Sequence, residues 1–281
     1  MSEKLFFLNG KRAMVSLGPL TDSRHCPYQC AFCYVQDGFN KYATLDEDEI
    51  MDFLKINRDN YHIIYISGDT DSFAAPRTNK ALSLLKRMAF ELDVDLLFTT
   101  RTTFKPEHYE VLRQIAEEQQ RTNNALYACI SITRYSDDVN YIEPAPIPSP
   151  DERIQTIINL KRIGATTVLA LRPFLPVVDV NDYITIIDKT MGSVDIVLGE
   201  CFYFIRDGKI YQRVFKDGYK EQWEKNTEHG ISMGFDDNKL EWDVWDSMDY
   251  QEIVRKHCEN HGIIFSMHSD DAIIRFTMKK A

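Results

Sequence analysis

The segment HCPYQCAFCYV, residues 25–35, carries three of the six cysteines in the 281-residue chain. Cys26, Cys30 and Cys33 stand there in C-x3-C-x2-C spacing. The other three cysteines are isolated in the sequence: Cys129, Cys201 and Cys258. A chain of this size in a reducing compartment does not need disulfides to hold a core together. The tight triplet therefore predicts a metal or iron–sulfur site.

Outward from this segment, short apolar runs alternate with stretches of helical spacing. The apolar runs predict six strands, at residues 13–17, 61–66, 94–99, 126–132, 166–171 and 194–198. Helical spacing predicts five helices, at residues 46–56, 79–92, 106–119, 150–163 and 181–191. This alternation predicts a parallel sheet covered by helices, either closed into a barrel or open and doubly wound. In both folds the loops after the strands carry the chemistry, and the cysteine triplet follows the first strand.

The pattern changes after about residue 198. We expect residues 1–200 to form the main domain and residues 201–281 to form an α+β extension packed on it. Asp207-Gly208 separates two β-like runs and predicts a hairpin. A short helix is expected at residues 249–260 and a last strand at residues 263–267.

Composition narrows the function classes. With 33 Lys and Arg against 43 Asp and Glu, the formal net charge is −10, and 44% of the residues are hydrophobic. No apolar run approaches the ~18 residues of a membrane span, and the N-terminus lacks the pattern of a secretory signal. We therefore expect a cytoplasmic protein without a membrane segment. The excess of acid argues against an extended surface for nucleic acid.

Three thiolates suit one kind of metal centre in particular. A [4Fe–4S] cluster needs four ligands, so three cysteines leave one iron open to an exogenous ligand. A structural zinc site needs a fourth Cys or His instead. His25 adjoins Cys26 and cannot easily close the same tetrahedron, although a distant cysteine could. A zinc- or cluster-binding protein without catalysis is therefore the alternative from another functional class.

The triplet with Phe32 beside its last cysteine, after the first strand of a six-fold β/α pattern, resembles the radical S-adenosylmethionine superfamily. The resemblance covers about residues 13–200 and implies a partial (β/α)6 TIM-like barrel. It implies a [4Fe–4S] cluster on Cys26, Cys30 and Cys33, with S-adenosylmethionine on the open iron. In that superfamily, reductive cleavage of the cofactor yields a 5′-deoxyadenosyl radical that abstracts a hydrogen atom from substrate. The resemblance also implies an external electron donor of the flavodoxin or ferredoxin type.

Further positions match the cofactor site of that superfamily. Ser67, Gly68 and Asp69 follow the second strand, where the family usually has a Gly-Gly-Glu-like stretch that binds the methionine amino group. An acid facing an ammonium group is suitable chemistry, although a simple strand-ending turn is the alternative. The resemblance assigns Phe32 to the same cofactor site.

One branch of the superfamily fits the order of several weaker motifs. The order of these motifs resembles the spore photoproduct lyase-like branch, also called DNA repair photolyase-like proteins. The motifs are Ser131 in the fourth strand, Glu143-Pro144, Arg153, Gly164 and then a strand that ends in LRPFLP. Ser131 and Arg153 would then contact the ribose or carboxylate of S-adenosylmethionine, although Arg153 could instead lie on a solvated helix face. Nucleobase-lesion repair is one candidate activity. The acidic charge favours a small molecule, nucleotide or peptide as substrate.

Cys201 follows the sixth strand in VLGECFYF and is the candidate hydrogen-atom donor to a product radical. The alternative is a buried structural cysteine, which is the usual role of an isolated one. Cys129 is a weaker candidate for the same role. Several aromatic residues follow that could stack on a planar base or form a core: Phe202, Tyr203, Phe204 and Tyr211.

Overall fold

The computed structural model describes residues 6–8, 12–17, 26–37, 46–68, 70–233 and 240–280. The chain forms two compact units. The first consists of Met1–Pro27, Tyr42–Ile130 and Asp151–Val168, and the second of Tyr28–Lys41, Ser131–Pro150 and Leu169–Ala281. This partition differs from the predicted division at residue 200, which stays a prediction.

The first unit is built on parallel strands. Strand β1 (Phe6–Leu8) pairs antiparallel with β2 (Arg12–Val15), and β2 runs parallel to β3 (Ile63–Ile66). Strand β3 runs parallel to β4 (Asp95–Thr100), and β4 to β5 (Leu126–Ser131). Most side chains of β3 to β5 are buried, because a parallel sheet is covered on both faces. The predicted strands are thus confirmed, apart from shifts of a few residues at their ends.

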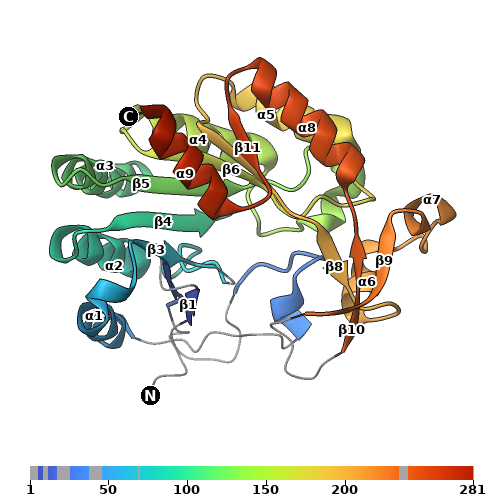
Figure 1. Ribbon diagram of the computed structural model, residues 1–281, viewed down its shortest axis with the longest axis horizontal. Helices are drawn as coiled ribbons and strands as arrows, with labels where there is room; N and C mark the ends of the chain where they lie inside the picture. The colour runs from blue at the N-terminus through green and yellow to red at the C-terminus, as the bar shows by residue number, and fades with distance from the viewer. Residues whose placement is uncertain are drawn as a thin grey trace. The chain divides into compact units, whose positions relative to one another are not determined.

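Four helices accompany these strands, and their ends follow from local chemistry. Helix α1 (Glu47–Ile56) begins at a capping box, in which the Asp46 carboxylate accepts from the Glu49 amide at 2.9 Å and Glu49 accepts from the Asp46 amide at 3.1 Å. The next two are α2 (Thr78–Glu91) and α3 (Pro106–Arg121), which pack on each other (Figure 1). Helix α4 (Pro150–Arg162) ends before Gly164, whose φ of +90° suits the end of a helix.

The second unit continues the alternation. Strand β6 (Thr166–Leu171) crosses the boundary between the units and is followed by α5 (Val180–Thr190) and β7 (Ile196–Gly199). Close to the end of the described chain, β11 (Ile264–Ser266) pairs parallel with β7. Helices α8 (Met248–Asn260) and α9 (Ser269–Lys280) pack on β11, as Figure 1 shows in red. The strand expected at residues 263–267 is therefore confirmed, whereas α9 was not predicted.

A second, smaller sheet also lies in this unit. Strand β10 (Glu241–Trp245) pairs antiparallel with both β8 (Phe202–Phe204) and β9 (Thr227–Ser232). Two short helices, α6 (Lys209–Val214) and α7 (Glu221–Glu224), belong to the same part of the chain. Aromatic rings pack beside this sheet: Phe202, Phe204, Tyr211, Phe215, Tyr219 and Trp223. Phe202 and Phe204 are buried, so these two rings are core.

The predicted hairpin at Asp207-Gly208 is wrong. Gly208 precedes α6 and donates its amide to the carbonyl oxygen of Ile205 at 2.9 Å, while β8 takes β10 as its partner. The reason is the spacing of Ile210 and Val214, which lie four residues apart and are both buried. Burial at helical spacing outweighs the turn signal of a single Asp-Gly pair. Across the described residues, no helix combines the length and apolar character needed to cross a bilayer.

Candidate functional site

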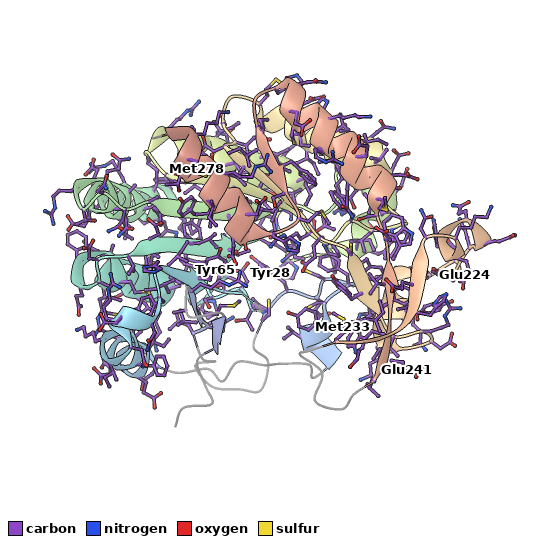
Figure 2. All side chains as sticks on the ribbon, in the orientation of Figure 1. Tyr28, Tyr65, Glu224, Met233, Glu241 and Met278 are labelled. Carbon is purple, nitrogen blue, oxygen red and sulfur yellow. The ribbon has the colours of Figure 1, made fainter. Side chains whose placement is uncertain are left out.

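The cysteine loop forms a tight turn. The Cys33 amide donates to the Cys30 carbonyl oxygen at 3.1 Å, and the 3-10 helix η1 (Tyr34–Asp37) begins immediately afterwards. Cys30 is buried, as is Tyr28 (Figure 2), whereas Cys26 and Cys33 are partly exposed. Cys26 belongs to the first unit, and Cys30 and Cys33 belong to the second. No disulfide joins any two of the six cysteines.

Residues from distant parts of the second unit bind the backbone of this loop. The Ala31 amide donates to the carbonyl oxygen of Ile142 at 2.9 Å, at the end of the 3-10 helix η3 (Asp137–Ile142). From α6, Arg213 Nε donates to the Ala31 carbonyl oxygen at 2.9 Å, and Arg213 Nη2 donates to that of Cys33 at 3.0 Å. The conformation of the loop is therefore specified by contacts outside it.

The donor set of the loop fits an iron–sulfur cluster. Three thiols on one short loop, with no fourth thiol in the motif, match a cubane that keeps one iron open. Within the described ranges, no three His, Cys, Asp or Glu side chains are gathered closely enough to hold a metal ion. The assignment of Cys26, Cys30 and Cys33 as ligands stays a prediction from spacing and donor chemistry.

The loop after β3 is held by buried serines. Ser67 adopts a left-handed φ of +69° and donates its amide to the Val15 carbonyl oxygen at 3.0 Å. Its Oγ accepts from the Ser72 amide at 3.0 Å, and Ser72 Oγ accepts in turn from the Leu17 amide at 3.3 Å. At Gly68 an added Cβ would lie 2.6 Å from Cε of Met14. The third residue of this predicted site, Asp69, lies outside the described residues.

Asp71, two positions further on, is a buried acid that was not predicted as a site residue. Its carboxylate accepts from Thr100 Oγ1 at 2.8 and 2.9 Å, from the Arg101 amide at 2.7 Å and from the Phe73 amide at 3.1 Å. Burial raises the pKa of Asp71, and the surrounding donors partly counteract that rise. The carboxylate thereby joins the loops at the carboxyl ends of β3 and β4, the edge where chemistry is expected.

The two remaining predicted cofactor residues are both buried. Arg153 in α4 is 0% exposed, so the alternative of a solvated helix face is wrong. A cation buried to this degree is rare without a partner that holds it. Ser131 ends β5 and is also buried. Their contact with S-adenosylmethionine stays a prediction.

Arg172 joins the carboxyl ends of the strands in the second unit. It follows β6 directly, donates from Nε to the Gly199 carbonyl oxygen at 3.1 Å and from Nη2 to that of Met267 at 3.4 Å. Its own carbonyl oxygen accepts from Thr133 Oγ1 at 3.0 Å. The ends of β6, β7 and β11 are thus linked through the Arg172 side chain, and Thr133 is linked to them through the Arg172 carbonyl oxygen.

Cys201 lies just after β7, beside α8. Its Sγ is 3.7 Å from Nε2 of Gln251, and the residue is partly exposed. Burial is the main cause that raises the pKa of the Cys201 thiol, and burial likewise raises the pKa of Tyr203 to about 12. The thiol is therefore protonated at neutral pH, which is the form that can donate a hydrogen atom. Cys129, on β5, is buried.

The arrangement of a thiol-rich loop after the first parallel strand agrees with a comparison of the sequence against family models. The model of the radical SAM superfamily matches residues 20–189, which is more than half of the chain and includes the cysteine triplet. The chain belongs to the radical SAM superfamily. Membership makes it an enzyme and implies a [4Fe–4S] cluster and S-adenosylmethionine as its cofactors. No curated protein sequence matches the chain.

Solved structures show the same fold. A spore photoproduct lyase mutant with bound AdoMet and dinucleoside spore photoproduct is 14% identical, with a TM-score of 0.67, over 94% of this chain and 79% of that one. Spore photoproduct lyase complexed with the dinucleoside photoproduct is 15% identical, with a TM-score of 0.61, over 85% and 73%. SuiB of Streptococcus suis, bound to its precursor peptide SuiA, is 12% identical, with a TM-score of 0.57, over 91% of this chain and 48% of SuiB.

These likenesses confirm the predicted α/β fold of the partial-barrel type. They do not assign individual residues. Asp71, Arg172 and Arg213 were not predicted as site residues from the sequence. Asp71 had a local signal, since it is the second acid of the stretch SGDTDS. Arg213 had none, because it lies 180 residues from Cys33 in the chain.

Proposed function

We propose that this radical SAM enzyme binds its [4Fe–4S] cluster through Cys26, Cys30 and Cys33 and cleaves S-adenosylmethionine reductively. When bound, the two cofactors supply a 5′-deoxyadenosyl radical that abstracts a hydrogen atom from the substrate. The observation that carries the proposal is the family match over residues 20–189, which includes all three cysteines. We propose a cytoplasmic location and an external flavodoxin- or ferredoxin-like electron donor.

In this proposal the chain's own residues orient S-adenosylmethionine and exclude water. Ser67, Gly68 and Asp69 bind its amino group, Ser131 and Arg153 its ribose or carboxylate, and Phe32 packs beside it. The complete burial of Arg153 supports a specific role, because a guanidinium removed from water must be held by hydrogen bonds or by an anion. The left-handed turn at Ser67 supports a loop shaped for close approach of a ligand.

We further propose that Cys201 returns a hydrogen atom to the product radical: its S–H bond breaks as a C–H bond forms, and the resulting thiyl radical takes one electron from the external donor and one proton. Its position directly after β7, its partial exposure and its raised pKa support this role, because a thiol, not a thiolate, carries the hydrogen. Cys129 stays the weaker candidate because it is buried within β5.

The substrate proposed is a small molecule, nucleotide or peptide. The net charge of −10 supports a compact substrate over an extended nucleic acid. The solved neighbours are described with different substrates, a dinucleoside photoproduct for the lyase and a precursor peptide for SuiB. Repair of a nucleobase lesion is the second candidate, favoured because this chain covers 79% of the lyase but 48% of SuiB.

Anaerobic reconstitution tests the proposal. We expect about four irons per chain and release of 5′-deoxyadenosine from S-adenosylmethionine once a strong reductant is added. Stoichiometric zinc with no cleavage would overturn the proposal in favour of a non-catalytic metal-binding protein.

Affinity for DNA separates the two substrate classes. Binding to DNA phosphates weakens steeply as salt rises, with a slope proportional to the number of phosphates neutralised. We expect no salt-dependent binding of an oligonucleotide carrying a thymine lesion. Tight binding with a steep salt slope would establish the repair candidate.

A further inference from the structure

The cysteine loop and helix α6 are joined by one side chain, Arg213. Its guanidinium donates from Nε to the Ala31 carbonyl oxygen at 2.9 Å and from Nη2 to the Cys33 carbonyl oxygen at 3.0 Å. All three residues belong to the second unit, where α6 packs against η1. Figure 1 shows η1 in blue beside the orange helix α6.

The geometry suits arginine in particular. Two carbonyl oxygens lie two residues apart on a turn closed by the Cys33-to-Cys30 hydrogen bond. A planar guanidinium presents parallel donors that match such a pair, whereas an ammonium group offers a single charged point. Arg213 therefore fixes the orientation of two peptide groups of the loop, the one after Ala31 and the one after Cys33.

A second contact braces α6 itself. Tyr141 in η3 donates its hydroxyl to the Val214 carbonyl oxygen at 3.0 Å, next to Arg213 in the chain. The following residue of η3, Ile142, accepts the Ala31 amide at 2.9 Å. Each of the three segments, the loop, η3 and α6, is thus hydrogen-bonded to the other two. Arg213 makes the hydrogen bonds between α6 and the loop.

The charge of Arg213 has a consequence for the cluster. Three thiolates give the loop a concentrated negative charge when a cluster is bound, and reduction adds one more electron. A guanidinium held against the loop backbone stabilises that added charge and makes the reduction potential less negative. Arg213 also lies outside the segment that the family model matches, residues 20–189.

We propose that Arg213 is the positioning residue of the cluster loop, which holds Cys30 and Cys33 for ligation and eases reduction of the cluster by its charge. This inference rests on the proposed function, because it presumes that these cysteines are the ligands. It assigns part of the cofactor site to the region after the family-matched segment.

The first test uses the full chain without a cluster. Arg213→Gln removes both the positive charge and the paired N–H donors of the guanidinium. The control is Lys209→Gln, which removes an equal charge at an exposed position of the same helix. At a pH that fully ionises the thiols of every variant, we expect iodoacetamide to alkylate Cys33 about tenfold faster in Arg213→Gln, with faster exchange of the Ala31 amide, and no change in Lys209→Gln. Equal alkylation and exchange in all three proteins would overturn the positioning role.

The second test uses the reconstituted enzyme. In an EPR-monitored redox titration, we expect a more negative midpoint potential for Arg213→Gln and an unchanged one for Lys209→Gln. Arg213→Lys keeps the positive charge but lacks the paired N–H donors of the guanidinium. Its midpoint potential should therefore equal that of the unmodified protein, whereas alkylation of its Cys33 should stay as fast as in Arg213→Gln. An unchanged potential in Arg213→Gln overturns the electrostatic role.

Failure of the unmodified protein to bind about four irons would instead overturn the proposed function. The alkylation result does not depend on that outcome, because it is measured on the chain without a cluster.

Discussion

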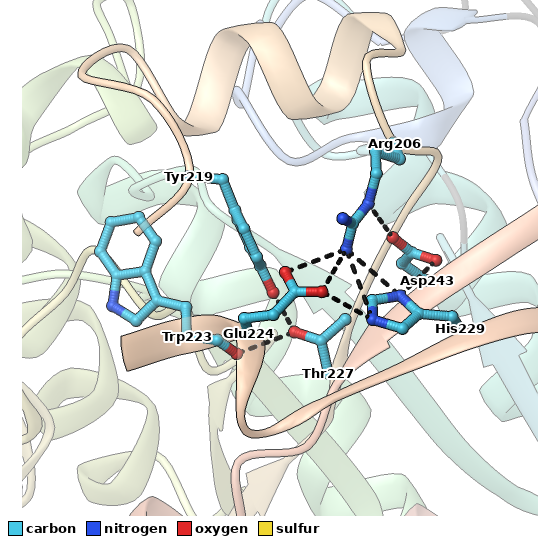
Figure 3. Close-up of polar contacts among 7 residues, drawn as sticks. All are labelled: Arg206, Tyr219, Trp223, Glu224, Thr227, His229 and Asp243. Atoms are coloured by element: carbon cyan, nitrogen blue, oxygen red, sulfur yellow. Dashed lines mark hydrogen bonds and ion pairs between the residues drawn. The ribbon is translucent and has the colours of Figure 1, made fainter. Parts of the chain in front are cut away.

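Asp71 and Asp243 are both carboxylates with 6% of their surface exposed, but the two regions that bury them use different partners. Asp71, in the family-matched segment, accepts from a hydroxyl and two backbone amides. Asp243, on β10 in the smaller sheet, lies 2.9 Å from Nε of Arg206 and 3.0 Å from Nδ1 of His229 (Figure 3). Glu224 completes the second arrangement, 3.2 Å from Arg206 and 2.9 Å from His229.

The difference separates two uses of a buried acid. Backbone donors place a carboxylate relative to the chain, so Asp71 fixes the shape of two loops at the edge of the parallel sheet. Opposite charges hold the side chains around Asp243, so we expect this group to stabilise the small sheet by an amount that falls as salt rises. We therefore expect changes in the matched segment to affect cofactor chemistry, loop shape and stability, and changes in the small sheet to affect stability in a way that depends on salt.

The largest expected effect comes from Cys30→Ala. Two remaining thiolates cannot hold the cubane firmly, so iron should fall from about four per chain to almost none, with loss of all 5′-deoxyadenosine. Iron analysis and product chromatography after anaerobic reconstitution measure both quantities. Cys201→Ser, in the region after the matched segment, should keep its iron. Full cleavage by Cys30→Ala would refute the ligand assignment and the contrast between the regions.

Asp71→Asn should have the next largest effect. The substitution replaces one carboxylate oxygen of Asp71 with an NH2 group, which cannot accept a hydrogen bond. A buried donor that now bonds to that oxygen then loses its acceptor, so the free energy of unfolding should fall by about 1–3 kcal/mol. Thr100→Val removes one of these donors and should cost less. Urea denaturation of the three proteins measures the difference, and a loss below that of Thr100→Val would contradict the placement of Asp71.

The cost of Asp71→Asn should also depend on pH. Burial raises the pKa of Asp71 above its ordinary value of 3.8, so the folded state holds the proton more tightly than the unfolded state. The contribution of this carboxyl to the free energy of unfolding is then fully present below pH 3.8 and is lost as pH rises through the raised pKa. The gap in unfolding free energy between wild type and Asp71→Asn should narrow as pH rises from 3.8, and a widening gap would have the wrong sign.

Arg206→Gln should have a smaller effect that responds to salt. Its side chain is 43% exposed, so its ion pairs with Asp243 and Glu224 are screened, and we expect a loss of about 1 kcal/mol at low salt. The loss should shrink as sodium chloride is added in thermal or urea unfolding. Arg255→Gln, which breaks an exposed pair with Glu252 on α8, is the matched control and should change stability less. A loss of stability that does not change with salt would contradict the contrast, because it would show that Asp243, like Asp71, does not depend on screened ion pairs.

The smallest effect on stability is expected for Cys201→Ala, below about 1 kcal/mol, because the side chain is only partly buried. S-adenosylmethionine cleavage should persist while conversion of substrate to the reduced product falls. Product analysis in deuterated water measures the second effect. Unchanged product formation would return Cys201 to a structural role.

Periodicity in the sequence predicted the alternating strands and helices of the parallel sheet, because buried strands and amphipathic helices have distinct repeats. The turn signal of Asp207-Gly208 predicted a hairpin wrongly, because burial of Ile210 and Val214 on a short helix decides the structure there. The cysteine loop was predicted from spacing because its ligands are adjacent in the chain. Asp71 accepts from Thr100, 29 residues away, and Arg213 donates to Cys33, 180 residues away, and no local sequence pattern specifies these two contacts.

The 180 residues between Cys33 and Arg213 also set an order of events during synthesis. A ribosome adds roughly 5–20 residues per second, so the cysteine loop leaves it roughly 10–40 seconds before the arginine that binds its backbone. During that interval three neighbouring thiols are open to oxygen and to stray metal ions, which oxidise or occupy them readily. We therefore expect the backbone contacts from Arg213 that shape the cysteine loop to form only after the arginine has been synthesised, and the loop to be most sensitive to oxygen before then.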